Sequence, residues 1–238
     1  NYNYALGLSN EPGSVFKMAG YLSLFDDGFI TTADSINSNH ASGMFGGRLL
    51  TDDGHNTQYT FLTPGKAFAI SSNVAIANWL TKYYGNNKQK FYEKLQQFGL
   101  TNLTKIDLKG ERSPFINKPE NWSAMSIAWI GHGYEVKFTP LQILAFYNAI
   151  ANNGTRVKPY LVQQVVDNGK VIREYKSTSD KKICNEKAAQ MAKEIMLRVV
   201  EDENGTGRKI YTPHYRIAGK SGTAKMSFGS NGYTDKNL

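Results

Sequence analysis

Apolar residues recur at the spacing of an α-helix in six segments of the chain. In the clearest case Phe91, Leu95 and Phe98 stand at i, i+4 and i+7, and Gly99 follows as a helix terminator. Thr139-Pro140 begins another segment, with a hydroxyl at the N-cap and a proline in the first turn. The six patterns predict helices directly after residues 12–13 and over 64–70, 74–85, 91–99, 140–152 and 185–200.

Strand patterns are concentrated in the last third of the chain. Residues 159–166 and 170–175 flank Asp167-Asn168-Gly169 and predict a hairpin with a tight turn. A further strand is predicted over 215–224, whereas the first fifty residues, rich in Gly, Ser, Asn and Asp, predict loops around one helix. Because helices come first and strands do not alternate with them, the predicted fold class is α+β with an antiparallel sheet.

The composition narrows the class of protein. The chain has 238 residues, 40% hydrophobic and 20% charged, which is ample for one folded domain and excludes disorder or collagen-like structure. The net charge of +8 comes from Lys and Arg residues that form no long run, so nucleic acid is not a predicted partner. The best apolar stretch, 67–80, is interrupted by polar residues and is shorter than the roughly 18 residues of a membrane-spanning helix.

The cysteine and histidine residues predict neither a metal site nor a cofactor. A single cysteine, Cys184, cannot form an internal disulfide or a cysteine-based zinc cluster. The four histidines, at positions 40, 55, 132 and 214, include no pair at metal-ligand spacing. Any catalysis is therefore expected to depend on ordinary side chains.

Three short motifs carry residues suited to nucleophilic catalysis. They are Ser14-Val15-Phe16-Lys17, Ser71-Ser72-Asn73 and Lys220-Ser221-Gly222-Thr223. Ser14 and Lys17 stand three residues apart at a helix start, so their side chains can meet on one face. A serine hydroxyl is a weak nucleophile until a base takes its proton. A lysine can be that base when burial or nearby positive charge, from the helix N-terminus and Lys220, favours its neutral form.

The second and third motifs each have a structural and a functional interpretation. Ser71 and Asn73 lie at a break between two predicted helices, where they either cap the second helix or project into a cleft. In the third motif, Gly222 lacks the side chain that would block an incoming substrate backbone, while Lys220 and the two hydroxyl groups can hold a carboxylate. The structural alternative is an edge strand weakened by glycine.

The three motifs and their flanks resemble those of the penicillin-binding protein transpeptidases. The segments 11–17, 71–73 and 218–224 are similar to the Ser-x-x-Lys, Ser-x-Asn and Lys-Thr/Ser-Gly signatures of that family, in the same order. Ile106–Glu111 resembles its Ile-Asp-Leu-Pro-Gly-Glu segment with Lys109 in place of proline, and Gly131–Gln142 resembles its glycine-rich turn and following helix. The class B, division-type branch of the family has segments similar to two in this chain: the Glu-Pro-Gly-Ser sequence that ends at Ser14, and Gly205-Thr206-Gly207.

The resemblance implies a peptidoglycan D,D-transpeptidase that works through a serine acyl-enzyme. It implies that Ser14 is the nucleophile, Lys17 its base and Ser71 the group that relays a proton to the leaving D-Ala. Substrate binding is implied for the side chains of Asn73, Lys220, Ser221 and Thr223, with Gly222 beside them. The backbone N–H groups of Ser14 and Thr223 are implied to stabilise the oxyanion.

The resemblance also implies an architecture, a location and partners. Residues 1–238 are expected to form one transpeptidase domain, truncated at both ends, with an antiparallel sheet flanked by helices, a largely helical subdomain and further C-terminal strands missing. The implied location is the bacterial inner membrane, with the catalytic domain in the periplasm and the anchor outside this chain. The implied partners are stem peptides ending in D-Ala-D-Ala, β-lactam antibiotics, and division-complex membrane proteins including a lipid-II glycosyltransferase.

Two alternatives share the three motifs. A serine β-lactamase or D,D-carboxypeptidase passes the acyl group to water. The candidate glutamates between the second and third motifs do not lie in the Glu-x-x-Leu-Asn setting of class A β-lactamases; they are Glu93, Glu111, Glu120 and Glu135. A non-catalytic penicillin-sensing domain keeps the same residues, and turnover distinguishes it from an enzyme.

Overall fold

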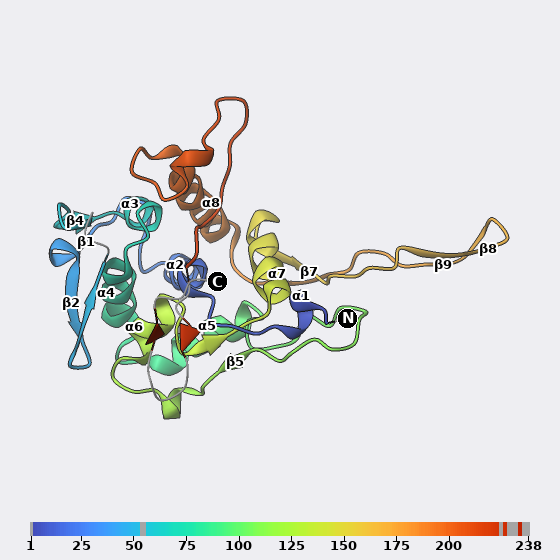
Figure 1. Cartoon of the computed structure of the whole chain (residues 1–238), viewed down its shortest axis with the longest axis horizontal. Helices are drawn as coiled ribbons and strands as arrows, with labels where there is room; N and C mark the ends of the chain where they lie inside the picture. Colours follow the sequence, from blue (N-terminus) through green and yellow to red (C-terminus); the bar gives the residue numbers. More distant parts are fainter. Residues whose placement is uncertain (1, 53–55, 224–225, 228–232, 235–238) are drawn as a thin grey trace.

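Helices form the body of the molecule (Figure 1). The computed structural model describes residues 2–52, 56–223, 226–227 and 233–234. Its α-helices are α1 (Tyr4–Gly7), α2 (Lys17–Asp26), α3 (Pro64–Ala69), α4 (Asn73–Tyr84), α5 (Lys88–Gln97), α6 (Ser126–Gly131), α7 (Pro140–Ala151) and α8 (Glu186–Glu201). Short 3₁₀ turns are η1 (Gly13–Phe16), η2 (Asn39–Ala41), η4 (Pro119–Asn121) and η5 (Arg208–Ile210). No described helix is both long and apolar enough to cross a membrane.

The six predicted helices are confirmed, and their ends follow local capping chemistry. At the start of α7, Thr139 Oγ1 accepts from the N–H of Gln142 at 3.3 Å, and Gln142 Oε1 accepts from the N–H of Thr139 at 3.0 Å. At the start of α8, Asn185 Oδ1 accepts from the N–H of Ala188 at 2.8 Å. Each cap satisfies backbone donors that a helix leaves unpaired at its first turn.

The described strands pair antiparallel in two-stranded sheets, so the fold class is α+β as predicted. The pairs are β1 (Ile36–Asn37) with β4 (Phe61–Leu62), β2 (Ser42–Phe45) with β3 (Arg48–Thr51), β5 (Phe115–Ile116) with β6 (Val136–Lys137), β7 (Thr155–Val157) with β10 (Ser179–Lys182), β8 (Gln164–Asp167) with β9 (Lys170–Glu174), and β11 (Met226–Ser227) with β12 (Tyr233–Thr234). The β8–β9 pair is the predicted hairpin, with its turn at residues 168–169.

Two sequence predictions are wrong. Residues 215–223 of the predicted strand 215–224 have no strand pairing among the described residues, and residue 224 lies outside them. A strand is defined by a partner that the residue pattern does not reveal. The first fifty residues contain more than loops around one helix, because they include α1 and most of the β2–β3 hairpin, which turns at Gly46-Gly47.

Helix α2 runs through the centre of the molecule and places the first motif. All its residues from Lys17 to Phe25 are buried, and it packs against α4, α5, α6 and α8. A helix that is buried on every side has no polar face, as its sequence Met-Ala-Gly-Tyr-Leu-Ser-Leu-Phe shows. The buried helix fixes Lys17 at its first turn, and η1 places Ser14 just before it.

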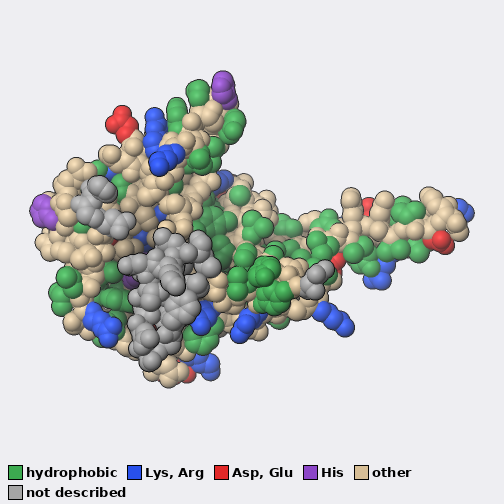
Figure 2. All heavy atoms as spheres, viewed as in Figure 1, with side chains coloured by type: hydrophobic (Ala, Val, Ile, Leu, Met, Phe, Trp, Pro, Cys, Tyr) green, Lys and Arg blue, Asp and Glu red, His purple; other side chains and the backbone are tan. Residues whose placement is uncertain are grey.

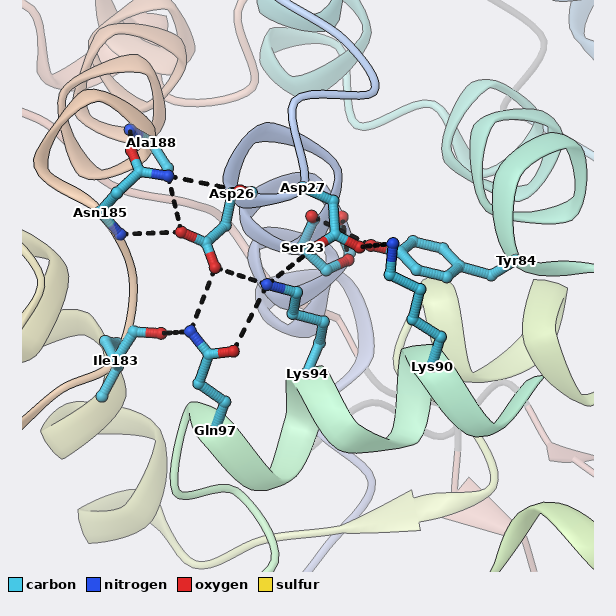
Figure 3. A network of polar contacts seen from close by, with 11 residues as sticks. Ser23, Asp26, Asp27, Tyr84, Lys90, Lys94, Gln97, Ile183, Asn185 and Ala188 are labelled. Carbon is cyan, nitrogen blue, oxygen red and sulfur yellow. Dashed lines mark hydrogen bonds and ion pairs between the residues drawn. The ribbon is translucent and has the colours of Figure 1, made fainter. Parts of the chain in front are cut away.

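The other end of α2 is held by a network of charged and polar groups (Figure 3). Lys94 Nζ lies 2.6 Å from Asp26 Oδ2 and 2.8 Å from Asp27 Oδ1, and Lys90 Nζ lies 3.0 Å from Asp27 Oδ2. The Tyr84 hydroxyl donates to Asp27 at 2.8 Å. Burial opposes ionisation of Asp27, but the hydrogen bonds from Lys94, Lys90 and Tyr84 outweigh it and lower the pKa of that carboxyl.

The same network connects α2 to α8. Asp26 Oδ1 accepts from the N–H of Asn185 at 2.7 Å and from its amide Nδ2 at 2.8 Å (Figure 3). Gln97 Nε2 donates to Asp26 Oδ2 at 3.1 Å and to the carbonyl of Ile183 at 2.7 Å. The C-terminal end of α2, the end of α5 and the start of α8 are thus held at one point.

The β8–β9 hairpin extends away from the body as a narrow arm (Figures 1 and 2). Its strands are exposed along their whole length, and hydrophobic side chains such as Val171 and Ile172 face solvent. At its base the carboxylate of Asp107 accepts from the N–H groups of Leu161 at 2.9 Å and Val162 at 3.2 Å. This contact fixes where the arm leaves the body.

Candidate active site

The segment that leads to Ser14 is held against the turn before α7. Asn10 and Phe138 form an antiparallel bridge, with N–H to carbonyl distances of 3.1 and 3.0 Å. Glu11 Oε1 accepts from the N–H of Glu135 at 3.0 Å. The N–H of Gly13 donates to the carbonyl of Gly133 at 3.1 Å. Four hydrogen bonds therefore fix the backbone immediately before the predicted nucleophile.

The approach of these two segments requires glycine at position 133. Gly133 has φ +93°, and a Cβ placed on it would lie 2.0 Å from the carbonyl oxygen of Gly13. That distance is far inside van der Waals contact, and the positive φ disfavours any side chain. The glycine-rich turn of the sequence therefore sets the position of the Ser14 turn.

Ser14, Lys17 and Ser71 come together as one hydrogen-bonded group. Lys17 is fully buried, and its Nζ donates to the carbonyl of Ser71 at 2.5 Å and to Ser71 Oγ at 3.0 Å. Ser71 Oγ lies 3.1 Å from Ser14 Oγ and donates to it. Ser71 is thus the bridge between the lysine and the predicted nucleophile, although it is 54 residues away from Lys17 in sequence.

The second motif divides its roles between its three residues. Ser72 caps α4, with its Oγ accepting from the N–H of Ala75 at 3.0 Å. Ser71 does not cap the helix and instead contacts Lys17. Ser71 has φ +59°, which turns the chain sharply between α3 and α4. Asn73 is the first residue of α4, and its Nδ2 donates to the carbonyl of Thr51 at 3.4 Å.

The third motif passes beside the Ser14 turn. A Cβ placed on Gly222 would lie 2.8 Å from Val15 Cγ1, so the motif and the residue after Ser14 are in close contact. Lys220 Nζ donates to the carbonyl of Ser221 at 3.1 Å and lies 5.6 Å from the centre of the Phe68 ring. Burial lowers the pKa of Lys220 to about 8. Thr223 is exposed at the end of this segment.

A groove and a half-buried tyrosine flank the Ser14 turn on the side of α7. The groove has a volume of about 540 Å³ and is lined mainly by apolar side chains, with Val15 and Lys220 on its walls. The hydroxyl of Tyr147, on α7, donates to the carbonyl of Val15 at 2.7 Å. Burial raises the pKa of Tyr147, so the hydroxyl remains a donor at physiological pH.

Two residues near the site were not predicted from the sequence. His132 is buried beside Lys17, and its Nδ1 lies 2.7 Å from the carbonyl of Ala128. Burial, and then the charge of Lys17, lower the pKa of His132 to about 4, so its imidazole is neutral at physiological pH. The sequence showed it within a glycine-rich turn, Gly-His-Gly. The second residue, Asp52, binds the start of α4 and has no motif around it.

The described residues do not gather three His, Cys, Asp or Glu side chains in a group that could hold a metal ion. The first two motifs join two hydroxyl groups to one buried amine, and the neighbouring third motif adds a second amine and two further hydroxyl groups. Such a set can transfer a proton from a serine and bind an anionic group beside it.

Comparisons with known proteins agree with this arrangement. A family model described as the penicillin-binding protein transpeptidase domain matches residues 1–238. Penicillin-binding protein PbpB of Mycolicibacterium smegmatis is 29% identical over 221 residues, covering 91% of this chain and 33% of that protein. Stage V sporulation protein D of Bacillus subtilis is 26% identical over 230 residues, covering 94% and 34%. The chain thus spans about a third of the length of these relatives.

The fold is shared with solved structures. The crystal structure of penicillin-binding protein 3 from Mycobacterium tuberculosis, complexed with ampicillin, matches with a TM-score of 0.86 and 27% identity, covering 98% of this chain and 52% of that chain. The transpeptidase domain of penicillin-binding protein 3 from Burkholderia pseudomallei matches with a TM-score of 0.82 at 23% identity, which supports the fold alone.

Proposed function

The chain belongs to the penicillin-binding protein transpeptidase domain family, and on that basis we propose that it is a peptidoglycan D,D-transpeptidase acting through a serine acyl-enzyme. The observation that carries the proposal is the hydrogen-bonded line from Lys17 through Ser71 to Ser14. An amine, a bridging hydroxyl and a nucleophile hydroxyl at hydrogen-bond distance are the parts that serine acylation requires.

In the proposed acylation step, Ser14 Oγ attacks the carbonyl carbon of the penultimate D-Ala of a stem peptide. The neutral fraction of Lys17 takes the hydroxyl proton through Ser71 as the C–O bond forms. The tetrahedral oxyanion is stabilised by the backbone N–H groups of Ser14 and Thr223. The C–N bond then breaks, the proton held by Lys17 passes through Ser71 to the leaving amine, and terminal D-Ala departs.

The second step transfers the acyl group. The amine of a neighbouring stem peptide attacks the Ser14 ester and gives up a proton to neutral Lys17 through Ser71. The ester C–O bond then breaks, and this proton returns to Ser14 Oγ. Lys220, Ser221 and Thr223 hold the terminal carboxylate of the donor peptide, and Asn73 binds its backbone. The position of the third motif against Val15 supports this assignment, because it places the cation of Lys220 next to the nucleophile turn.

We also propose a setting for this activity. Relatives named as probable or homologous FtsI transpeptidases support a role in septal cell-wall synthesis. The proposed partners are stem peptides, β-lactams, and division-complex membrane proteins including a lipid-II glycosyltransferase. The ampicillin complex of a structural relative supports binding of β-lactams, which we propose react covalently with Ser14. The proposed location is the bacterial inner membrane, with this domain on the periplasmic side.

Product analysis tests the proposal. The protein is incubated with a synthetic pentapeptide ending in D-Ala-D-Ala, with and without an acceptor peptide that carries a free amine. A transpeptidase releases D-Ala and forms the cross-linked dimer with acceptor present. Release of D-Ala without any dimer indicates a carboxypeptidase, and rapid penicillin turnover indicates a β-lactamase. No release of D-Ala, with a stable penicillin adduct, indicates a sensor.

A further inference from the structure

A carboxylate outside the three motifs binds the segment that follows Ser71. Asp52 lies directly after β3, and its Oδ2 accepts from Ser72 Oγ at 2.5 Å. Its Oδ1 accepts from the backbone N–H groups of Asn73 at 2.5 Å and Val74 at 2.9 Å. These N–H groups belong to the first turn of α4 and have no partner within the helix, and the negative charge complements the helix dipole. Asp52 therefore holds three consecutive residues of this turn.

Ser71 depends on external support because its backbone conformation is unfavourable. Its φ of +59° is in the left-handed region, which residues with a side chain rarely adopt. In this conformation both its carbonyl oxygen and its hydroxyl contact Lys17 Nζ, at 2.5 and 3.0 Å. The contact between Lys17 and Ser14 through Ser71 therefore requires that the turn stay in a conformation it does not favour by itself.

The turn is held from two sides. On the side of α3, the N–H groups of Ser71 and Ser72 donate to the carbonyls of Phe68 at 3.2 Å and Ala67 at 2.8 Å. On the side of α4, the hydrogen bonds to Asp52 hold residues 72–74. Loss of the Asp52 contacts frees the α4 side of the turn. It also leaves three donors, the Ser72 hydroxyl and the N–H groups of Asn73 and Val74, without their acceptor.

We propose that Asp52 is a positioning residue for the acylation step: it holds the α4 side of the strained turn so that Ser71 bridges Lys17 and Ser14. Asp52 makes no contact with the reacting hydroxyl in this arrangement and acts through Ser71. The inference rests on the proposed function, because it assigns the Lys17–Ser71–Ser14 line to acylation. A displacement of about 1 Å in such a line lowers a reaction rate by as much as about 100-fold.

The test separates binding from chemistry. The acylation of the protein by a fluorescent penicillin is followed at several concentrations, which gives the dissociation constant of the initial complex and the first-order acylation rate constant. Asp52→Ala is expected to lower the rate constant by about 10- to 100-fold and to change the dissociation constant by less than about 3-fold. Asp52→Asn keeps an acceptor oxygen but loses the charge, so the expected loss is intermediate, about 3- to 10-fold.

Ser72→Ala is the matched control. It removes the cap of α4 and one of the three bonds to Asp52, but leaves the two backbone N–H bonds to Asp52 in place. The melting temperature is expected to fall by several degrees, about as far as in Asp52→Ala, because a helix cap is lost. The acylation rate constant is expected to stay within about 3-fold of the parent, which a purely structural role of Asp52 does not predict.

The acylation rate constants of the two variants decide whether Asp52 positions Ser71. A parental acylation rate constant in Asp52→Ala overturns the inference, as does an equal loss in Ser72→Ala. If Asp52→Ala does not fold, Asp52→Asn decides: a lowered rate constant with an unchanged dissociation constant supports positioning, and a parental rate constant refutes it. If the parent itself forms no adduct, the proposed function fails first, and the inference that rests on it fails too.

Discussion

Replacing Gly133 with alanine tests how the Ser14 turn is held in place. The new Cβ would lie 2.0 Å from the carbonyl oxygen of Gly13, and the hydrogen bond from the N–H of Gly13 to the carbonyl of Gly133 joins the same two residues. The side chain cannot move away because a Cβ has no rotatable bond of its own. One of the two backbone segments must shift, and the segment that ends at Ser14 shifts with it.

The size of the effect follows from three contributions. A side chain at φ +93° costs about 1–2 kcal/mol. Loss or distortion of the Gly13–Gly133 hydrogen bond costs about 1 kcal/mol. The backbone shift that relieves a contact of 2.0 Å, where real Cβ atoms stay beyond 3.0 Å, adds about 1–3 kcal/mol, as in overpacked interiors. We therefore expect Gly133→Ala to lower the free energy of unfolding by about 3–6 kcal/mol.

Gly47→Ala is the matched control for the cost of the backbone conformation. Gly47 has φ +83°, close to that of Gly133, but a Cβ there meets no atom within 4 Å. Its expected cost is therefore the conformational part alone, about 1–2 kcal/mol. Urea unfolding followed by circular dichroism gives both free energies, and labelled penicillin gives the acylation rate. Equal losses of stability in the two variants, or a parental acylation rate in Gly133→Ala, would refute the reasoning.

Three further predictions concern charged groups. Because the pKa of Lys220 is lowered to about 8, its cation is lost as pH rises through about 8, and the second-order rate constant for acylation by a β-lactam is expected to fall there. Lys220→Arg is expected to move that fall to higher pH. Because the pKa of His132 is lowered to about 4, the unfolded state binds more protons than the folded state between pH 6.5 and 4. The free energy of unfolding, measured with urea, should therefore fall by up to about 3 kcal/mol as pH drops through that range, and His132→Gln should reduce this pH dependence. Lys94→Met leaves the carboxylates of Asp26 and Asp27 without their shared cation, so we expect the free energy of unfolding at pH 7, measured by urea unfolding, to fall by about 3 kcal/mol.

The parts of the fold that the sequence predicted are those set by local chemistry. Helix α7 begins at Thr139-Pro140 because the cap and the proline act within four residues, and α8 begins after Asn185 for the same reason. The β8–β9 hairpin was predicted because its turn residues also act locally. The third motif was wrongly predicted as a strand over its described residues, since pairing depends on a partner elsewhere in the chain.

The candidate site shows the same division. Ser14 and Lys17 are one helical turn apart, so their proximity follows from the sequence. Ser71 reaches Lys17 and Ser14 because α3 and α4 pack against α2, and the spacing of the motifs in the sequence does not reveal this packing. Only the resemblance to the family predicted that Ser71 belongs to the site. Nothing in the sequence predicted the role of Asp52, because it lies 21 residues from the Asn73 N–H that it binds and belongs to no motif.

The assignment of Ser14 as the nucleophile is tested by the intact mass of the protein after incubation with benzylpenicillin, followed by peptide mapping of the adduct. We expect one penicilloyl group per molecule, mapped to Ser14, that persists after free penicillin is removed, and no adduct in Ser14→Ala. Ser72→Ala, which keeps Ser14, Lys17 and Ser71, should still be acylated. An adduct on another residue, or an undiminished adduct in Ser14→Ala, would contradict the central claim.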